Sequence, residues 1–340
     1  MTVEVGQQEP RWVLRPARPE DYALFVRLFA ELGVDDPPPP ASVWEVESLP
    51  LTVIAEGPEG VAGYAATEPL GELGYVGQLV VAPSARRQGL GRWMMERLAE
   101  RLRARGCQRW ALNVKRDNTP ALRLYASVGL RPARQAANLK LTRAQVAALP
   151  AAPPGLRVVP MSAEEAEALT AAWGLMPGKL ARYATKASHR LLRLEVAAPG
   201  AHAPDRRANV QGSGAVPPPE RGLEKPDAGA AAASSGSAAP GSAVASSGAE
   251  APAGSGASGR GGEGSPGLMD LRASARLLFP FFAATPGHAR ALMEDAFARV
   301  GDAVDSLNVV VTDDAPLDAL LRAAGAEVRH ETFELRGPLP

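Results

Sequence analysis

The sequence predicts an α/β (α+β) fold, a mixed central sheet flanked by helices, that occurs twice along the 340 residues. Short apolar runs alternate with amphipathic stretches on both sides of a low-complexity tract, and this alternation is typical of strands and helices packed in layers. Motifs of the first half recur in the same order in the second half, which indicates an internal repeat. We therefore expect two tandem domains, one over residues 1–150 and a degenerate copy over residues 151–340.

The elements of the first half follow from the spacing of its apolar residues and from its glycines and prolines. From Leu90 to Leu102 apolar residues recur at helical spacing, arginines largely occupy the opposite face, and Gly106 ends the helix. The prolines of DDPPPPAS predict a stiff loop. In order, we expect a strand at 12–17, a helix at 19–33, two strands within 51–67 around a turn at 57–60, a strand at 75–82, the helix from 90, a strand at 109–114 and a helix at 120–129.

The repeat aligns two pairs of segments. NVKRDNTPALRLYASVG, which begins at Asn113, lines up with NVVVTDDAPLDALLRAAG, which begins at Asn308, if one residue is inserted before the proline. GLGRWMME, which begins at Gly89, lines up with GHARALME, which begins at Gly287. The second half is therefore expected to repeat the strand and helix order of the first.

Residues 199–266 interrupt the second copy with a tract rich in Ala, Gly, Ser and Pro. This composition can bury too little apolar surface to offset the entropy of ordering it, so we expect a disordered insert. On the repeat alignment the insert lies where the first copy has the EGPEG turn between two strands. Loop tips accept long insertions at small cost, so the position is physically reasonable.

The composition limits the partners of the chain. Lys+Arg 37 balance Asp+Glu 37, so neither nucleic acid nor an anionic membrane is expected as a partner. No apolar stretch reaches the roughly 20 residues that cross a bilayer, and the first residues do not resemble a signal peptide. The single Cys107 excludes an internal disulfide, so we expect a cytoplasmic protein. The four His are scattered and predict no metal site, and the oligomeric state stays open.

The stretch SARRQGLGRWMMERL places two glycines directly before a helix. The first N–H groups of a helix lack intrahelical acceptors, the helix dipole favours negative charge there, and Gly89 and Gly91 allow close backbone approach. Arg86 and Arg87 add positive charge. No Lys-Ser or Lys-Thr follows, which excludes a P-loop, and Met94 stands where a dinucleotide fingerprint needs its third glycine. The turn therefore predicts a site for another kind of phosphate-bearing ligand.

VVAPSARRQGLGRWMMERL, followed by LNVKRDNTPALRLYASVGL, resembles the two signature motifs of the GNAT superfamily of acetyl-CoA-dependent N-acetyltransferases. The resemblance covers residues 13 to about 141. It implies the GNAT fold, acetyl-CoA as the acetyl donor, and transfer of acetyl to a primary amine by direct attack. We expect a small-molecule amine as the acceptor. The alternatives are a protein N-terminal or lysine acetyltransferase, and a non-catalytic acyl-CoA-binding regulatory module.

The resemblance also implies roles for single residues. Tyr125 would face the thioester sulfur and donate a hydrogen bond to it, and Asn118 would bond the pantetheine arm. Both residues also fit ordinary structural roles, Tyr125 in the core and Asn118 as a helix N-cap. The remaining residues implied to hold the coenzyme are Leu79, Val80 and Val81 for the pantetheine arm and the acetyl carbonyl, and Arg86, Arg87, Gln88, Gly89, Leu90, Gly91 and Arg92 for the pyrophosphate.

The general base stays open at this stage. GNAT enzymes that acetylate ribosomal-protein N-termini carry a Glu where this sequence has Asn113. The aromatic pair expected after the last helix of that group is also missing from LRPARQAANLKL, which disfavours a protein N-terminal acceptor. Glu68, Glu72 or a chain of water molecules are the candidates for the base.

The second copy lacks two of the implied functional groups. On the repeat alignment Arg86 becomes Ala284 and Tyr125 becomes Leu321. We therefore expect a domain without catalysis that packs on the first and shapes its acceptor cleft. Residual coenzyme A binding stays open, because Gly287 is retained.

Overall fold

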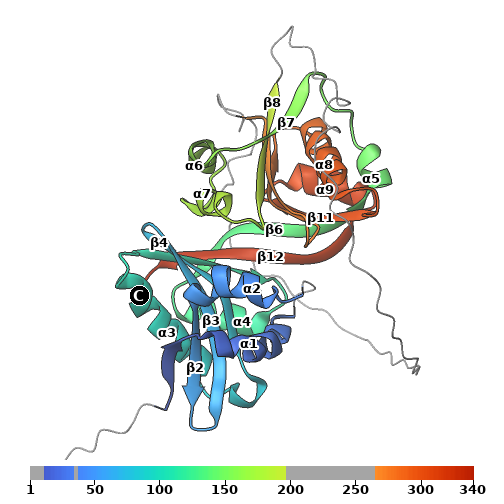
Figure 1. Cartoon of the computed structure of the whole chain (residues 1–340). Helices are drawn as coiled ribbons and strands as arrows, with labels where there is room; N and C mark the ends of the chain where they lie inside the picture. The colour runs from blue at the N-terminus through green and yellow to red at the C-terminus, as the bar shows by residue number, and fades with distance from the viewer. Residues whose placement is uncertain (1–10, 34–36, 197–264) are drawn as a thin grey trace, which may run out of the picture. The chain divides into compact units, whose positions relative to one another are not determined.

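The computed structural model of the chain describes residues 11–33, 37–196 and 265–340 (Figure 1). Its strands form one 12-stranded sheet in the order β1-β2-β3-β4-β5-β12-β6-β11-β10-β9-β8-β7. The sheet is mixed, since β4 and β5 are parallel, as are β10 and β11, whereas the other neighbours are antiparallel. The predicted fold class is therefore confirmed. The expected disordered insert lies outside the described residues, apart from 265 and 266.

The first half has the elements that the apolar spacing predicts, with shifts of a few residues at their ends. The strand expected to end at residue 67 continues to Leu70, which is buried together with Leu73. The loop predicted for the DDPPPPAS segment is wrong from Ala41 on, because a short helix begins there. A proline that precedes a helix does not remove any of the hydrogen bonds of the helix. The main elements are β1 (Val13–Pro16), α1 (Tyr22–Phe29), α2 (Ala41–Val43), β2 (Thr52–Gly57), β3 (Gly60–Leu70), β4 (Leu73–Val81), α3 (Leu90–Arg103), β5 (Arg109–Lys115), α4 (Thr119–Ser127) and β6 (Arg131–Thr142).

The second half repeats this order after the short helix α5 (Arg143–Ala147). Pro120 and Pro316 are each the second residue of a helix, and Gly129 and Gly325 each follow that helix with φ of 88° and 89°. The aligned motifs therefore occupy equivalent places in the two copies. The elements are β7 (Leu156–Pro160), α6 (Ala163–Ala172), α7 (Lys179–Ala184), β8 (Arg190–Val196), β9 (Gly267–Arg272), β10 (Leu277–Ala283), α8 (Pro286–Val300), β11 (Ser306–Thr312), α9 (Ala315–Ala323) and β12 (Glu327–Pro338). Among the described residues, no helix has the length and apolar character needed to span a membrane.

The two halves exchange their last strands. β12, from the second half, lies between β5 and β6 of the first and pairs antiparallel with both (Figure 1). In turn β6 pairs with β11 of the second half, from Thr142 opposite Ser306 to Ala136 opposite Thr312. The domain boundary between residues 150 and 151 stays a prediction. With that boundary, the sheet of each domain includes one strand contributed by the other domain.

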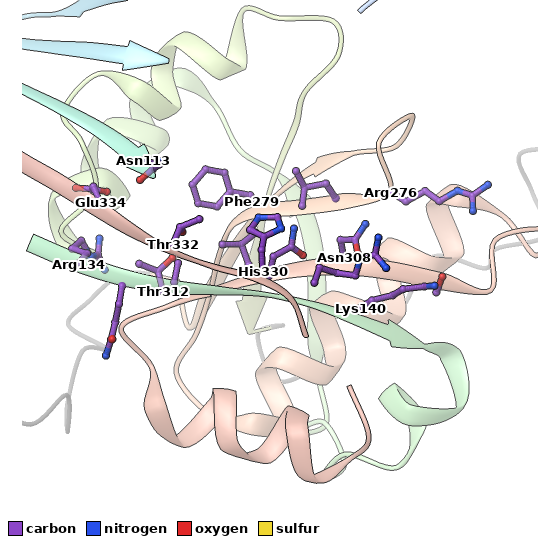
Figure 2. A pocket seen from close by; sticks show the side chains of 17 residues that line it. Asn113, Arg134, Lys140, Arg276, Phe279, Asn308, Thr312, His330, Thr332 and Glu334 are labelled. Carbon is purple, nitrogen blue, oxygen red and sulfur yellow. The ribbon is translucent and has the colours of Figure 1, made fainter. Parts of the chain in front are cut away.

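Helices cover both faces of the sheet. In the first half α3 and α4 pack on Trp110 and Leu112 of β5, and α1 packs on the opposite face against Ile54 and Tyr64. In the second half α8 and α9 pack on one face, and α6 and α7 on the other. Side chains alternate along a strand, so residues between the apolar ones point to the opposite face. On the central strands these residues are mostly polar and line a cavity (Figure 2).

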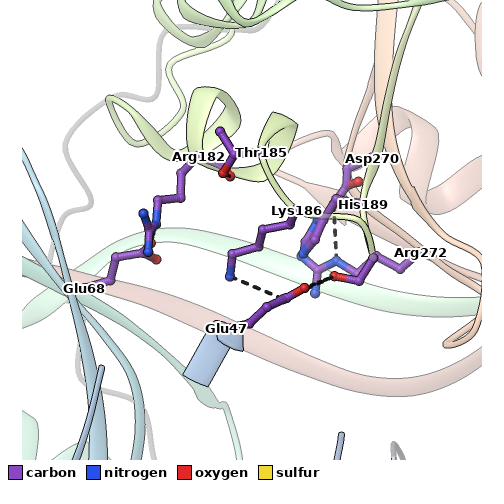
Figure 3. A network of polar contacts seen from close by, with 9 residues as sticks. Glu47, Glu68, Arg182, Thr185, Lys186, His189, Asp270 and Arg272 are labelled. Carbon is purple, nitrogen blue, oxygen red and sulfur yellow. Dashed lines mark hydrogen bonds and ion pairs between the residues drawn. The ribbon is translucent and has the colours of Figure 1, made fainter. Parts of the chain in front are cut away.

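The buried carboxylate of Asp270 links β9 to residues 189 and 190, which follow α7 and lead into β8 (Figure 3). Asp270 of β9 is fully buried. His189 Nδ1 lies 2.5 Å from Asp270 Oδ2, Arg272 Nε donates to the same oxygen at 3.2 Å, and the backbone N–H of Arg190 donates to Oδ1 at 3.2 Å. Three donors therefore compensate the loss of hydration of this carboxylate.

Polar contacts of the α7 region also join the two halves (Figure 3). Arg182 forms an ion pair with Glu68 of β3. Lys186 Nζ lies 3.7 Å from Glu47 Oε2. Lys179 Nζ lies 4.0 Å from the ring centroid of Tyr75 on β4, a cation–π distance. The second half is thus tied to the first by side chains as well as by exchanged strands.

Replacing Asp270 with asparagine is expected to lower the free energy of unfolding by about 3–5 kcal/mol, because Arg272 would lose its buried counter-charge and His189 would lose the carboxylate oxygen that it contacts. The measurement is urea unfolding followed by fluorescence. The control is Glu96→Gln, which breaks an exposed helical pair with Arg92 and is expected to change stability by no more than about 0.5 kcal/mol. Equal midpoints for the two variants would contradict the assignment.

Candidate active site

The sheet of the first half splits between β4 and β5. The two strands are paired in parallel only from Leu73 opposite Arg109 to Val76 opposite Leu112, although β4 continues to Val81. A bulge marks the start of the split, since the register with β3 shifts so that Gly77 has no partner there. Beyond the bulge, no described strand pairs with the edge of β4 that faces β5. Leu79, Val80 and Val81 lie on this stretch, so their main chain can take up hydrogen bonds from an extended ligand.

The N-terminus of α3 lies at the end of a loop over residues 82–89. Arg87 and Gly89 both adopt left-handed backbone conformations, with φ of 63° and 86°. Within the described part of the chain, the backbone N–H groups of residues 87–92 have no hydrogen-bond acceptor. A Cβ atom built on Gly89 would meet nothing within 4 Å, so the helix end is open. The six consecutive amides, together with the positive end of the helix dipole, form a site for an anion.

The side chains of the loop are less free than the sequence indicates. Arg86 Nη2 lies 2.5 Å from Glu31 Oε2, and Arg86 Nε donates to the carbonyl of Val81 at 3.1 Å. Gln88 donates to the carbonyl of Ser84 at 2.9 Å. These bonds hold the loop against the end of β4 and against the segment after α1. Arg86 therefore positions the loop in addition to adding charge.

Two other arginines complete the predicted set. Arg92 forms an exposed pair with Glu96 at 3.1 Å, one helical turn further on. Arg87 is exposed, and no described residue forms an ion pair with it. Leu90 is buried beneath the loop, and Gly91 packs closely, since an added Cβ would lie 3.2 Å from Leu124. Arg87 is thus the side chain best placed to meet a phosphate at the helix end.

Tyr125 lies on α4 in the core cluster between the helices and β5. It is 8% exposed, and burial raises its pKa to about 12. No described residue forms a hydrogen bond with its hydroxyl. A phenol with this pKa remains neutral at physiological pH, so Tyr125 can donate a hydrogen bond and cannot act as a base.

Asn118 caps α4, because its Oδ1 accepts a hydrogen bond from the backbone N–H of Ala121 at 3.2 Å. The structural role weighed from the sequence is therefore confirmed, whereas its contact with a coenzyme stays a prediction. The side chain is exposed at the start of the helix. Its Nδ2 group has no acceptor among the described residues.

Glu68 and Glu72, the acidic residues considered as a general base, do not lie near the end of β4 at Val81. Glu72 precedes β4 whereas Val81 ends it, so the length of the strand, roughly 3.3 Å per residue, separates them. Glu68 is opposite Tyr75 in the β3–β4 register, is nearly buried and forms its ion pair with Arg182. Neither carboxylate therefore lies beside the split end of β4.

A carboxylate that local sequence reasoning missed lies beside Asn113. Glu334 of β12 is the register partner of Asn113 on β5, and both side chains line the cavity on the polar face of the sheet. Glu334 is paired with Arg336 on its own strand, and its side chain is 13% exposed. No local motif could have indicated this residue, because it reaches Asn113 only through the exchanged strand.

The equivalent place in the second half is closed. β10 stays paired with β11 as far as Phe281 opposite Val311, and only residues 284 and 285 separate β10 from α8. Thr285 Oγ1 caps the helix by accepting from the backbone N–H of His288 at 3.3 Å. A Cβ atom built on Gly287 would lie 2.6 Å from the carbonyl oxygen of Ala151, so the chain itself covers this helix end.

The fold and the split sheet with an open helix end define an α/β protein with a site for an extended, anionic ligand. Residues 21–130 match the sequence model of the acetyltransferase (GNAT) family. The match lies in the first half of the chain and includes the motifs around Gly89 and Asn118. Among curated proteins no sequence matches this chain.

Three solved structures have a similar fold along nearly the whole chain. A GCN5-related N-acetyltransferase from Sphaerobacter thermophilus is 19% identical with a TM-score of 0.58, over 97% of this chain and 96% of that one. A putative acetyltransferase from Pyrococcus horikoshii is 13% identical with a TM-score of 0.60, over 99% and 92%. A tandem GNAT protein from the clavulanic acid biosynthesis pathway is 16% identical with a TM-score of 0.54, over 97% and 99%. The tandem GNAT fold expected from the internal repeat is thereby confirmed.

Tyr125 is expected to stay protonated above pH 10, because burial raises its pKa to about 12 whereas an exposed tyrosine is half ionised near pH 10. The test is spectrophotometric titration of the phenolate band in the wild type and in Tyr125→Phe. The two proteins should show equal phenolate absorbance up to about pH 10.5 and differ only above it. A deficit in the variant at pH 10 would mean that the hydroxyl titrates as an exposed group.

Proposed function

We propose that the first half transfers acetyl from acetyl-CoA to the primary amine of a small molecule by direct attack. The observation that carries this proposal is the open N-terminus of α3 beside the split between β4 and β5. The amides of residues 87–92 would bind the coenzyme pyrophosphate with Arg86 and Arg87 nearby, and Leu79, Val80 and Val81 would bond the pantetheine arm. Asn118 Nδ2 would add a further contact to that arm.

The chemistry requires stabilisation of an oxyanion and then of a thiolate. Main-chain N–H groups near Val80 and Val81 are the donors for the oxyanion. Tyr125 supplies a hydrogen bond that strengthens as the sulfur leaves. Full proton transfer from a phenol of pKa about 12 to a thiolate of pKa about 8.5 is uphill by roughly 5 kcal/mol, so the proton that the thiolate takes up comes from the positively charged nitrogen of the tetrahedral intermediate, which becomes the amide nitrogen of the product.

The second half is proposed to bind no coenzyme and to perform no catalysis. In support, β10 and β11 do not split, the helix end of α8 is capped by Thr285, and the chain at Ala151 covers Gly287. Leu321 stands where the first copy has Tyr125 and is fully buried. The acetyl donor would therefore be bound once per chain.

Calorimetric titration is expected to give one acetyl-CoA per chain, and Gly89→Ala is expected to weaken its binding at least tenfold. A side chain at φ of 86° strains the turn and shifts the amides that meet the pyrophosphate. Gly106→Ala is the matched control, because Gly106 has φ of 84° and open space around it at the other end of α3. Two equivalent sites, or equal affinity loss in both variants, would overturn the proposal.

Tyr125→Phe is expected to lower kcat by roughly 10²–10⁴-fold and to leave acetyl-CoA binding nearly intact, because the hydrogen bond to sulfur forms only as the thiolate leaves. Thiol release measures the rate, and calorimetry measures binding. Tyr64→Phe is the control, since Tyr64 is also buried and its hydroxyl has no partner among the described residues. An unchanged rate in Tyr125→Phe would remove Tyr125 from the mechanism.

A further inference from the structure

A cavity of about 400 Å³ runs along β6 on the polar face of the central strands (Figure 2). The strand register defines its two ends. Glu334 of β12 is opposite Arg134 of β6, whereas Asn308 of β11 is opposite Lys140 of β6. Six residues along β6 separate Arg134 from Lys140, so the two ends lie roughly 20 Å apart. They are therefore separate places, and a small molecule bound at one end does not reach the other.

The two ends occupy equivalent positions of the repeat and carry opposite charges. Asn113 and Asn308 are aligned with each other in the two copies. Asn113 is opposite Glu334 on the exchanged strand β12, and Asn308 is opposite Lys140 on the exchanged strand β6. A carboxylate in the first half thus corresponds to an ammonium group in the second. The end of the cavity at Lys140 and Asn308, here called the second-half end, therefore favours ligands of negative charge.

Two cationic side chains extend toward the second-half end, Arg276 and Lys140 (Figure 2). Lys140 Nζ lies 3.7 Å from Glu327 Oε2, whereas Arg329 is bound to the same carboxylate at 2.8 Å. Glu327 does not line the cavity. Of the described residues that do, Glu334 is the only acidic one, and it lies at the opposite end. No carboxylate of the lining therefore competes with a ligand for the two cations.

The backbone fixes the position of Arg276 at the rim of the cavity. Arg276 has φ of 51°, a left-handed conformation that is uncommon for a residue with a side chain. Its carbonyl accepts a hydrogen bond from the N–H of Asn308 at 2.8 Å, which joins the turn before β10 to β11. The side chain is exposed, and no described residue forms an ion pair with it. Such a guanidinium can bind a carboxylate or a phosphate through two parallel hydrogen bonds.

Two amide side chains add hydrogen-bond donors to the second-half end. The Oδ1 atoms of Asn138 and Asn308 are buried and have no partner among the described residues. The Nδ2 atoms are not buried in this way, so they face the cavity that both residues line. The reverse orientation would bury two unpaired donors per amide in place of one acceptor, which is less favourable. Ser306 also lines this end and adds a hydroxyl group.

The second-half end has the size and the apolar wall of a small-molecule site. Leu277 and Phe279 of β10 line it, and the cavity volume falls within the range of known ligand sites. Leu277 is opposite Asn308, which is opposite Lys140, so β10 and β6 lie two strand spacings, about 10 Å, apart. Arg276 and Lys140 can therefore contact a small ligand from two sides.

We propose that the second-half end binds a small molecule with at least two anionic groups, carboxylate or phosphate. Arg276 binds one of these groups and Lys140 the other, while the amides of Asn138 and Asn308 donate to the ligand oxygens. The inference does not rest on the proposed acetyl transfer. It gives the second half a ligand of its own, at a place distinct from the amides at the start of α3.

The test is calorimetric titration of the full chain with citrate and with 3-phosphoglycerate, and with neutral glycerol as the control ligand. Acetyl-CoA is present at saturation, so that the start of α3 is occupied. Each anion is expected to bind once per chain, and glycerol is expected not to bind. Their relative affinities show whether carboxylates alone suffice or a phosphate is preferred.

Arg276→Gln is expected to weaken binding of both anions by about tenfold, because it removes a charged hydrogen-bond donor. Lys140→Gln is expected to weaken it by about threefold, since Lys140 is half-exposed and also lies near Glu327. Arg103→Gln is the matched control, an exposed arginine at the end of α3 that should leave the affinity unchanged. Unchanged acetyl-CoA affinity of each variant verifies that it is folded.

The inference is overturned if neither anion binds saturably, or if Arg276→Gln and Arg103→Gln have equal effects. It is also overturned if Gly89→Ala abolishes anion binding while Arg276→Gln does not, because the anion would then occupy the start of α3. A wild type that fails to bind acetyl-CoA but binds citrate in an Arg276-dependent way would overturn the proposed function and support this inference.

Discussion

The exchange of the last strands is the constraint on which the rest of this structure depends. The fifth strand of each half is hydrogen-bonded to the last strand of the other half, so β12 lies next to β5 and β6 next to β11. Without the second half, β5 and β6 would each present a long edge of unpaired backbone groups, which favours aggregation. The ion pair of Glu68 with Arg182 strengthens the same contact. The second half is therefore required for the fold of the first half, whatever each of them binds.

The same repeat unit gives an open helix end in one copy and a closed one in the other. Residues 82–89 turn through two left-handed positions before α3, and this path leaves a row of amides with no acceptor in the described part of the chain. In the second copy residues 284 and 285 lead directly into α8, and Thr285 supplies the cap. The loop over residues 284 and 285 is too short to allow the end of β10 to separate from β11. The closed helix end and the continuous pairing of β10 with β11 thus occur together with the shorter loop.

Most strands and helices of the first half could be predicted from the sequence, because the residues that mark them are close together along the chain. Apolar spacing located nearly all the strands and helices of the first half, and Gly89, Gly106 and Pro120 lie at the helix ends they were expected to mark. Long-range partners could not be predicted. The pairing of Arg86 with Glu31 and the placement of Glu334 beside Asn113 depend on register in a sheet of both halves, which no local pattern encodes.

The proposed coenzyme site and the polar cavity draw on different parts of the chain. Every residue proposed to bind the coenzyme lies in the first half, on β4, α3 and α4 and the loops before these helices. The cavity on the polar face of the central strands is shared, with Asn113 from the first half and Glu334, Asn308 and Arg276 from the second. A substitution in β10, β11 or β12 can therefore change the shape and charge of this cavity without moving the amides at the start of α3. Because β12 also supplies the hydrogen bonds that complete the sheet of the first half, the lining of the cavity and the stability of the first half depend on the same strand.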